Sequence, residues 1–565
     1  MTIEAKTDSW NQVIAGGFIF PPIHSSTTLQ DAVNMATIAV DRHLANSPAV
    51  RAYLAELPKG PGTDCPDSPL DELVRYVADQ KGMIDKSDPA LSLRFLTTFI
   101  VPVFEFEREA VFKALNIIED RSLAEFFLFE DCANLSRATD RFWAKWFAAI
   151  TIPYQSLDEA GKKQYEERVR DTLAQYDYTV FDYDPRRGCT NRRTWAEAFP
   201  EEISEILELL YALEQTQIPE LADYFAVLYE AYGCTDINKL EELWTRVDEA
   251  WIRIPNTARL VPVHGMESGY EHPFGVSPEF RLEVRTSEGR DMIESRRRAT
   301  LSHAAAFRLS NEFVSAAVQK LEHIDISVFI TALRAGVCLN FRYAGQSVPN
   351  RQQVLAEGGR IFLDKSAAPR AAKRYVDNVM KHCAPATAHM LAPLITETAL
   401  LAHTATHEYA HPVGRTAKSD AKLGSEGMKL CEEAKATLLG ILADEHRDPS
   451  PAHRLEIIAT TAGRVLRFMD ATELESATFA PYVRENLAAA TMLFETGVMT
   501  LGADGVEVNL KAAKSPAWFK ALREFNRGVL NAYQAEDKTA LERLTERYCN
   551  REHPRVAALI AWVNR

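Results

Sequence analysis

The sequence has 565 residues, more than one hydrophobic core usually supports, so we expect at least two lobes. Apolar residues make up 46% and charged residues 25%, which is the balance of a soluble globular protein and excludes a disordered or fibrous chain. The net charge of −15 argues against a nucleic-acid or anionic-membrane partner, because both favour basic surfaces.

The amino-terminal segment MTIEAKTDSWNQVIAGG lacks the basic start, the apolar run and the cleavage site of a secretory signal. No stretch reaches 18 uncharged apolar residues, so we predict no transmembrane segment. The eight cysteines lie far apart and form no CxxC pair, which indicates thiols in a reducing compartment. The predicted location is the cytoplasm.

The first 255 residues have the apolar spacing of helices, interrupted by clusters of proline and glycine. The basic segment 183–197 is expected to form a surface loop. Helices are predicted over 29–57, 92–118, 121–148, 200–231 and 238–252.

The pattern changes between 256 and 290, where ARLVPV, EFRLEVRT and the later RIFLDK predict a small mixed sheet. A hairpin is predicted at 498–510, because Asp504-Gly505 suits a tight turn. The remaining helices are predicted over 291–322, 324–336, 366–383, 386–411, 425–445, 452–470, 480–500, 515–534 and 537–549. The predicted fold is therefore predominantly α with a small mixed β region.

The strongest local signal is the segment THEYAH at 406–411. Residues four apart lie on one face of a helix, so His407 and His411 can offer two imidazoles to one cation. Glu408 is placed to reach a metal-bound water as a general base, which is the zincin arrangement. Pro412 restrains the residue before it, so we expect the helix to end at His411.

A third ligand is predicted in the following helical segment, where Glu432 and Glu433 come 21 and 22 residues after His411. A carboxylate from that helix completes a His₂Glu zinc site with one open position. Because adjacent helical residues point about 100° apart, only one of Glu432 and Glu433 can bind the metal, and the other can orient a ligand histidine. His403 lies on the same stripe as the two ligand histidines; it can support the site, contact substrate or be a packed core histidine. His446 and His453 are assigned no role.

At these residues the sequence resembles the dipeptidyl peptidase III (M49) family of zinc metallopeptidases, as a divergent short member. HEYAH resembles the family's metal helix, and LCEEAKATLLG resembles its EECRAE helix. The resemblance implies that Glu433 binds zinc and that Glu432 orients a ligand histidine. Three further stretches, 264–284, 339–363 and 482–510, follow the family's order across about 240 residues.

The resemblance also implies substrate contacts. Glu267 would hold the free amino terminus of the substrate, and Tyr270 would stabilise the transition state. Asn340 and Asn350 would contact the substrate main chain. The family has a histidine at the position of Tyr482; a phenol can donate one hydrogen bond to an oxyanion but cannot carry a positive charge near neutral pH.

The architecture implied by the resemblance is two lobes flanking a wide cleft, with the metal helix in the helical lobe. Residues 1–290 would form the lower lobe, including the β-rich part at 256–290. Residues 291–322 would be an upper-lobe helix, 323–370 would return to the lower-lobe sheet, and 371–565 would be the helical upper lobe with the zinc site.

Three functions remain open from the sequence. The first is a zinc aminopeptidase-like hydrolase that releases dipeptides from the amino terminus of short peptides through Glu-assisted attack of zinc-bound water. The second is the same metal scaffold acting on a non-peptide small molecule as a hydrolase, lyase or oxidoreductase. The third is a catalytically inactive peptide-binding module, which would have no need of the water-activating Glu408.

Overall fold

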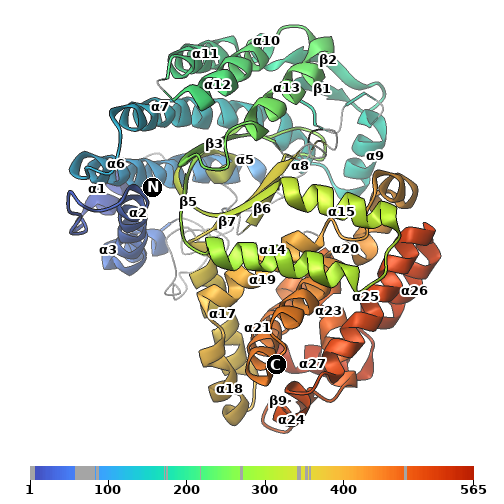
Figure 1. Ribbon diagram of the computed structural model, residues 1–565. Coiled ribbons are helices and arrows are strands. Elements are labelled where there is room, and N and C mark those ends of the chain that lie inside the picture. Colours follow the sequence, from blue (N-terminus) through green and yellow to red (C-terminus); the bar gives the residue numbers. More distant parts are fainter. Residues whose placement is uncertain are drawn as a thin grey trace. The chain divides into compact units, whose positions relative to one another are not determined.

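The computed structural model describes residues 7–57, 83, 88–170, 172–173, 176–216, 218–266, 271–339, 345–349, 351, 354, 358–475 and 480–565. The chain divides into two compact units. The first spans 1–286, 329–342 and 348–355, and the second spans 287–328, 343–347 and 356–565. Helices predominate and the sheets are small, which confirms the predicted fold class (Figure 1).

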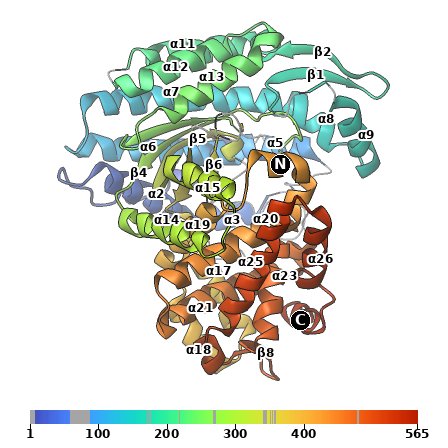
Figure 2. The ribbon, with the colours of Figure 1, turned by 45° about the vertical axis from the view of Figure 1, so that its right-hand side comes forward.

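The helices of the first unit follow the predicted apolar spacing, with breaks where proline begins a new helix. Two predicted helices are each divided in this way: 29–57 at Pro48 and 200–231 at Pro219. Figures 1 and 2 both show α11 and α12 side by side. The helices are α1 (Thr7–Ala15), α2 (Leu29–Asn46), α3 (Pro48–Ala55), α5 (Pro89–Phe95), η2 (Leu96–Ile100), α6 (Val101–Ile117), α7 (Leu123–Trp146), η3 (Phe147–Thr151), α8 (Ile152–Gln155), α9 (Glu159–Val169), α10 (Trp195–Ala198), α11 (Pro200–Glu214), α12 (Pro219–Tyr232), η4 (Ile237–Lys239) and α13 (Leu240–Ile252).

The main sheet has the strand order β3-β4-β5-β7-β6, which leaves β6 at one edge. Its strands are β3 (Leu260–His264), β4 (Glu279–Arg285), β5 (Ile324–Gly336), β6 (Gly345–Val348) and β7 (Gly359–Asp364), followed by the short helix η5 (Val337–Leu339) after β5. β3 and β5 both pair with β4 in antiparallel register. The small sheet predicted over 256–290 and at RIFLDK is thus confirmed, since β3, β4 and β7 lie in one sheet.

The helix predicted over 291–322 is two helices, Arg290–Ala305 and Asn311–His323, and the helix predicted over 386–411 is interrupted at Ala392–Leu394. Two further predictions were wrong in the type of element. The helix predicted over 324–336 is strand β5, because Ile324, Ile326, Val328 and Ile330 alternate with a period of two and β-branched residues fit a sheet. The loop predicted over 183–197 is mostly an antiparallel hairpin of β1 (Thr179–Asp184) and β2 (Gly188–Thr194). The prediction failed because it relied on charge. Strands rich in arginine can still pair when the arginine side chains remain in solvent.

A buried ion pair fastens the end of β5 to the helices of the first unit. Arg108 is 1% exposed and contacts Asp140 at 2.9 Å. Arg108 also donates to the carbonyl of Arg334 at 2.7 Å, while Asp140 accepts from the amide of Gly336 at 2.8 Å. Both charges are therefore compensated, and the strand end is fixed by backbone as well as side-chain contacts.

The second unit is a layered helical assembly with one hydrophobic core. Figures 1 and 2 show its C-terminal helices as the orange and red ribbons. The predicted hairpin at 498–510 is confirmed as β8 (Met499–Leu501) and β9 (Val506–Val508), with Gly505 at a positive φ of 133°. The helices are α14 (Arg290–Ala305), α15 (Asn311–His323), α17 (Ala367–His382), α18 (Pro385–Leu391), η6 (Ala392–Leu394), α19 (Glu397–Ala410), α20 (Ala417–Arg447), α21 (Pro451–Phe468), α22 (Ala471–Glu475), α23 (Ala480–Glu495), α24 (Leu510–Ala513), α25 (Ala517–Ala535), α26 (Lys538–Tyr548) and α27 (Pro554–Val563).

Among the described residues, one continuous helical stretch, Pro89–Ile117, is long and apolar enough by composition to span a membrane. Its most apolar window is 44% buried inside the protein. Trp10 donates to the carbonyl of Phe99 at 3.0 Å within this stretch. The core helix of a globular protein passes the same test of length and composition.

A buried histidine fixes the loop that leads into β4. Nδ1 of His272 accepts from the amides of Gly275 at 2.8 Å and Phe274 at 3.2 Å, and Nε2 lies 2.7 Å from the hydroxyl of Tyr165. Burial lowers the pKa of His272 to about 3. The ring is therefore neutral in the folded protein, because protonation of Nδ1 would remove its role as an acceptor.

This histidine should make the protein sensitive to acid. Its folded pKa lies below the value of about 6.5 in an unfolded chain. As the pH falls below about 6.5, the unfolded chain binds a proton that the folded chain does not, so the free energy of unfolding falls by up to about 1.4 kcal/mol per pH unit from this residue. We expect the melting temperature of the wild type to fall more steeply between about pH 7 and pH 5 than that of His272→Asn, measured by calorimetry. Parallel pH profiles would contradict this account.

Candidate metal centre

The helix that carries HEYAH begins and ends at defined residues. The side chain of Thr396 caps α19 by accepting from the amide of Ala399 at 3.1 Å. The helix ends at Ala410 with His411 as its C-cap, and Pro412 follows. The predicted end of the helix is therefore confirmed, and both histidines project from its last turn.

α19 packs against α20 at very short range. A Cβ atom at Gly440 of α20 would lie 2.8 Å from the carbonyl of Thr406 and 2.9 Å from the amide nitrogen of His407. Only glycine lets the two backbones approach so closely. This contact sets how far the carboxylates of α20 lie from the histidines of α19.

Three side chains converge between the two helices. Nε2 of His407 lies 3.0 Å from Nε2 of His411 and 3.3 Å from Oε2 of Glu433. Nε2 of His411 lies 4.0 Å from the same carboxylate oxygen. The ligand atoms all lie within 4.8 Å of one another. In a tetrahedral zinc site with bonds of about 2.0–2.1 Å, ligand atoms lie roughly 3.3 Å apart, so this donor set fits such an ion.

The opposite nitrogen of each histidine has a protein partner. Nδ1 of His407 lies 2.8 Å from the hydroxyl of Thr437, and Nδ1 of His411 lies 3.0 Å from Oε1 of Glu432. A ring that donates from Nδ1 presents a lone pair at Nε2. If both rings donate from Nδ1, their two Nε2 lone pairs face each other across 3.0 Å, an arrangement that a bound cation would stabilise.

The carboxylate of Glu433 completes the set. Its Oε2 is buried and has no hydrogen-bond partner among the described residues, which is costly for a charged oxygen unless a cation is present. Burial by itself raises the pKa of Glu433, but the charges of His411 and His407 lower it to about 2. Burial lowers the pKa of His407, and the nearby Glu433 raises it by more. Two imidazoles and one ionised carboxylate are the ligands of His₂Glu zinc sites.

Lys435 holds the end of the metal helix. Its side chain is 0% exposed, and its Nζ donates to the carbonyls of Ala410 at 2.9 Å, His411 at 2.7 Å and Val413 at 3.2 Å. The last carbonyls of a helix have no partner within the helix, and a cation there also interacts favourably with the helix dipole. A buried lysine thus fixes the turn that bears His411.

Lys435 also belongs to a charged cluster around Glu432. Oε1 of Glu432 lies 3.0 Å from Lys435 and 3.4 Å from Arg415, and Oε2 accepts from the hydroxyl of Tyr533 at 2.7 Å. Burial raises the pKa of Glu432, but Lys435, Arg415 and His411 together hold it well below its usual range. Glu432 is therefore ionised and can keep the ring of His411 in one orientation.

Glu408 and Tyr482 lie near this cluster. Glu408 follows His407 on α19 and is partly exposed. Tyr482 on α23 is partly buried beside Arg464. Burial raises the pKa of Tyr482, and the charges of Glu433 and Glu408 raise it further. The hydroxyl therefore stays protonated near neutral pH and remains a donor.

The other predicted substrate residues, Glu267, Tyr270, Asn340 and Asn350, lie outside the described residues. His403 lies on α19 but lines a separate cavity with His453. His446 lies 3.1 Å from the hydroxyl of Ser302. The structure therefore brings together His407, His411, Glu432 and Glu433, with Glu408 and Tyr482 nearby.

Sequence analysis missed several supporting residues. Thr437 lies four residues after Glu433 on α20, so helical spacing was a usable signal. Lys435 had no such signal, because its carbonyl partners are defined only by the crossing of two helices. Tyr533 comes 101 residues after Glu432 and is brought there by the packing of α25.

His407, His411 and Glu433 thus form a group of three side chains that could hold a metal ion. No protein-family profile matches the sequence, and no curated protein matches it. The structure is similar to that of DPP III from Caldithrix abyssi, with a TM-score of 0.58 and 16% identity over 79% of this chain and 94% of that one. It is also similar to dipeptidyl-peptidase III from Corallococcus sp. strain EGB, with a TM-score of 0.53 and 15% identity over 99% and 96%. The chain therefore has a fold of the dipeptidyl peptidase III type.

Thr437 should tune metal affinity. Thr437→Val keeps the side-chain shape but removes the acceptor for Nδ1 of His407, so the ring loses its fixed tautomer. We expect zinc affinity to fall by about 10- to 100-fold, measured by competition with a chromophoric chelator. The control is Thr404→Val on α19, whose hydroxyl bonds only to the carbonyl of Leu400 in its own helix. Equal affinity in the two variants would contradict this role.

Lys435 should be a large contributor to stability. Lys435→Met fills a similar volume but leaves three carbonyls and the buried Glu432 without their cation, so we expect a loss on the order of 3–5 kcal/mol in the free energy of unfolding. Urea denaturation of the metal-free protein measures this loss. The double variant Glu432→Gln/Lys435→Met should recover part of it, because it removes the uncompensated charge. A single variant with the midpoint of the wild type would refute the proposed role.

Proposed function

We propose that this protein is a zinc-dependent metallopeptidase of the dipeptidyl peptidase III type, which releases dipeptides from the amino terminus of short peptides. We further propose that it acts in the cytoplasm, with no nucleic-acid or membrane partner. The observation that carries the proposal is the convergence of His407, His411 and Glu433 beside Glu408. The names of the two similar structures favour a peptide as the substrate.

Each residue near the candidate metal site would have a separate role in peptide hydrolysis. His407, His411 and Glu433 would hold one zinc ion, which when bound supplies a Lewis acid and lowers the pKa of water to about 7. Glu408 would take a proton from the attacking water and later deliver it to the leaving amine. Glu432 and Thr437 would keep the two histidine rings in place during the reaction.

Two tyrosines would stabilise the developing negative charge on the scissile carbonyl. Tyr482 is supported by its raised pKa, which keeps its hydroxyl protonated beside Glu433 and Glu408. A neutral donor suits an oxyanion. Tyr270 would be the second donor, in accordance with the sequence resemblance.

The substrate main chain would pair with β6. This strand is at the edge of the main sheet, and an edge strand can accept an added peptide strand. A Cβ at Gly345 would lie 3.4 Å from Cγ2 of Thr404, so β6 begins beside the metal helix. Asn340 and Asn350, on either side of β6, would contact the peptide main chain, and Glu267 would bind its α-ammonium group.

Glu408 should be needed for turnover and not for metal binding. Glu408→Gln keeps the shape and removes the base, so we expect zinc to stay bound at one ion per chain while kcat falls by roughly 10²- to 10⁴-fold. Elemental analysis and a peptide-hydrolysis assay measure the two effects. Glu397→Gln, the same change at the exposed start of the same helix, is the control. Full activity in Glu408→Gln would refute the mechanism.

A panel of substrates should distinguish a peptidase from an enzyme that acts on a non-peptide small molecule. The non-peptide function is favoured by Tyr482, because the dipeptidyl peptidase III family, which the sequence resembles, has a histidine at this position. We expect zinc-loaded protein to cleave dipeptidyl-naphthylamides with a free amino terminus, and to cleave their N-acetylated forms far more slowly. No turnover of either set by fully zinc-loaded protein would favour the non-peptide function, and peptide binding without turnover would favour the inactive binding module.

A further inference from the structure

The second unit contains a cavity of about 330 Å³ on another side of the metal helix. It is enclosed by residues of α14, η6, α19, α20 and α21. On α19 it is lined by Ala402, His403 and Thr406. Helical geometry puts Ala402 and Thr406 roughly 100° or more around the helix from the stripe of His407 and His411, while His403 lies on that stripe one turn before His407. The lining does not include His407, His411 or Glu433. The cavity is therefore distinct from the metal centre, and its volume suits a small organic molecule.

Three polar atoms that line this cavity lack a hydrogen-bond partner among the described residues: Nε2 of His403, Oγ1 of Thr460 and Nε of Arg296. Thr460 is only 3% exposed. Nε of Arg296 lies 3.0 Å from Oδ1 of Asp444 but does not form a hydrogen bond with it. Buried polar atoms are rarely left unpaired, so these atoms favour a ligand that can accept several hydrogen bonds.

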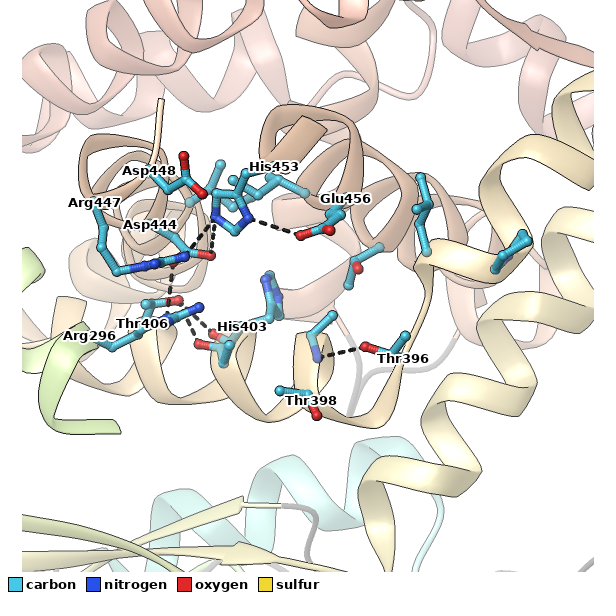
Figure 3. Close-up of a pocket in the computed structure, with 17 residues that line it drawn as sticks. Arg296, Thr396, Thr398, His403, Thr406, Asp444, Arg447, Asp448, His453 and Glu456 are labelled. Atoms are coloured by element: carbon cyan, nitrogen blue, oxygen red, sulfur yellow. Dashed lines mark hydrogen bonds and ion pairs between the residues drawn. The ribbon is translucent and has the colours of Figure 1, made fainter. Parts of the chain in front are cut away.

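The charges around the cavity restrict what that group can be. Figure 3 shows Asp444, Arg447, His453 and Glu456 as a linked chain above His403. Asp444 lies 3.0 Å from Arg447 and 3.1 Å from His453, and His453 lies 3.0 Å from Glu456. With Arg296 and Asp448, the polar wall carries three acidic and three basic groups. The two signs nearly balance, so this wall favours a ligand with at most one negative charge over a dianion such as phosphate.

Arg296 is a buried base beside two carboxylates. Burial lowers its pKa, and the charges of Asp444 and Asp448 only partly offset this effect. Burial also lowers the pKa of His403 to about 3, so its ring is neutral and can donate from Nε2. The guanidinium, the imidazole N–H and the threonine hydroxyl are donors that suit one carboxylate. The lining also includes the apolar side chains of Leu394, Ile441 and Ile457.

We propose that this cavity binds a small monocarboxylate with an apolar body, whose carboxylate accepts hydrogen bonds from Arg296, His403 and Thr460. The apolar body packs between α19 and α21. This inference does not depend on the proposed peptidase function, because it uses no residue of the metal centre.

Benzoate and 4-methylpentanoate are suitable probes, with benzamide as the uncharged comparison for benzoate. Titration calorimetry on zinc-loaded protein should show one saturable site for each acid, and benzamide should bind at least about tenfold more weakly, because it lacks the charge that strengthens these hydrogen bonds. The same affinity should be found after zinc is removed by chelation. Binding that disappears on chelation would mean that the acid binds at the metal, and it would overturn the proposal.

Variants of matched size locate the site. Thr460→Val removes one unpaired hydroxyl and should weaken benzoate binding about tenfold. Thr461→Val is the control, because this neighbouring buried hydroxyl bonds to the carbonyl of Ile457 in its own helix. Ala402→Leu fills the cavity and should abolish binding, with an unchanged melting temperature showing that the protein is folded. No saturable binding to the wild type, or equal binding to all three variants, would overturn the proposal.

Discussion

The close crossing of α19 and α20 is the contact on which the metal centre depends. Gly440 lets the backbone of one helix touch that of the other at Thr406 and His407. At this distance a glutamate from α20 reaches imidazoles from α19 directly, with no loop between them. Side chains on two packed helices have few rotamers available, so the donor geometry is fixed before any ion binds.

The crossing also brings two neighbouring carboxylates into a region with little solvent, and nearby groups compensate their charges. Glu432 is a buried carboxylate and the adjacent Glu433 is partly buried, and the two differ in the groups that surround them. Glu432 is compensated by Lys435 and Arg415, whereas Glu433 faces only the two imidazoles. This difference assigns their roles: the carboxylate with protein cations orients a ligand, and the one without them is free to bind a metal ion.

The same helix serves two environments. One face of α19 carries the histidines of the metal centre, and another lines a separate cavity whose polar atoms are partly unpaired. His403 lies one turn before His407, so spacing along the sequence groups them together. Their surroundings differ. His407 contacts Thr437 and Glu433, whereas Nε2 of His403 has no hydrogen-bond partner among the described residues.

Local patterns in the sequence explain much of the fold. Apolar spacing predicted most helices, and Asp504-Gly505 predicted the C-terminal hairpin, because these signals act within one element. The wrong predictions arose because pairing between elements, which a local pattern does not record, decided the structure. Ile324–Gly336 was taken for a helix although its β-branched residues alternate, and pairing with β4 decides the matter in favour of a strand.

The sequence by itself determined the candidate ligand residues and their spacing, since His407 and His411 share a helix face and Glu433 follows on the next helix. Only the tertiary structure decided which groups surround them. Tyr533 reaches Glu432 from 101 residues away, and Lys435 meets carbonyls that are exposed only at the end of another helix. Such contacts depend on how helices pack, which no pattern within a single element records.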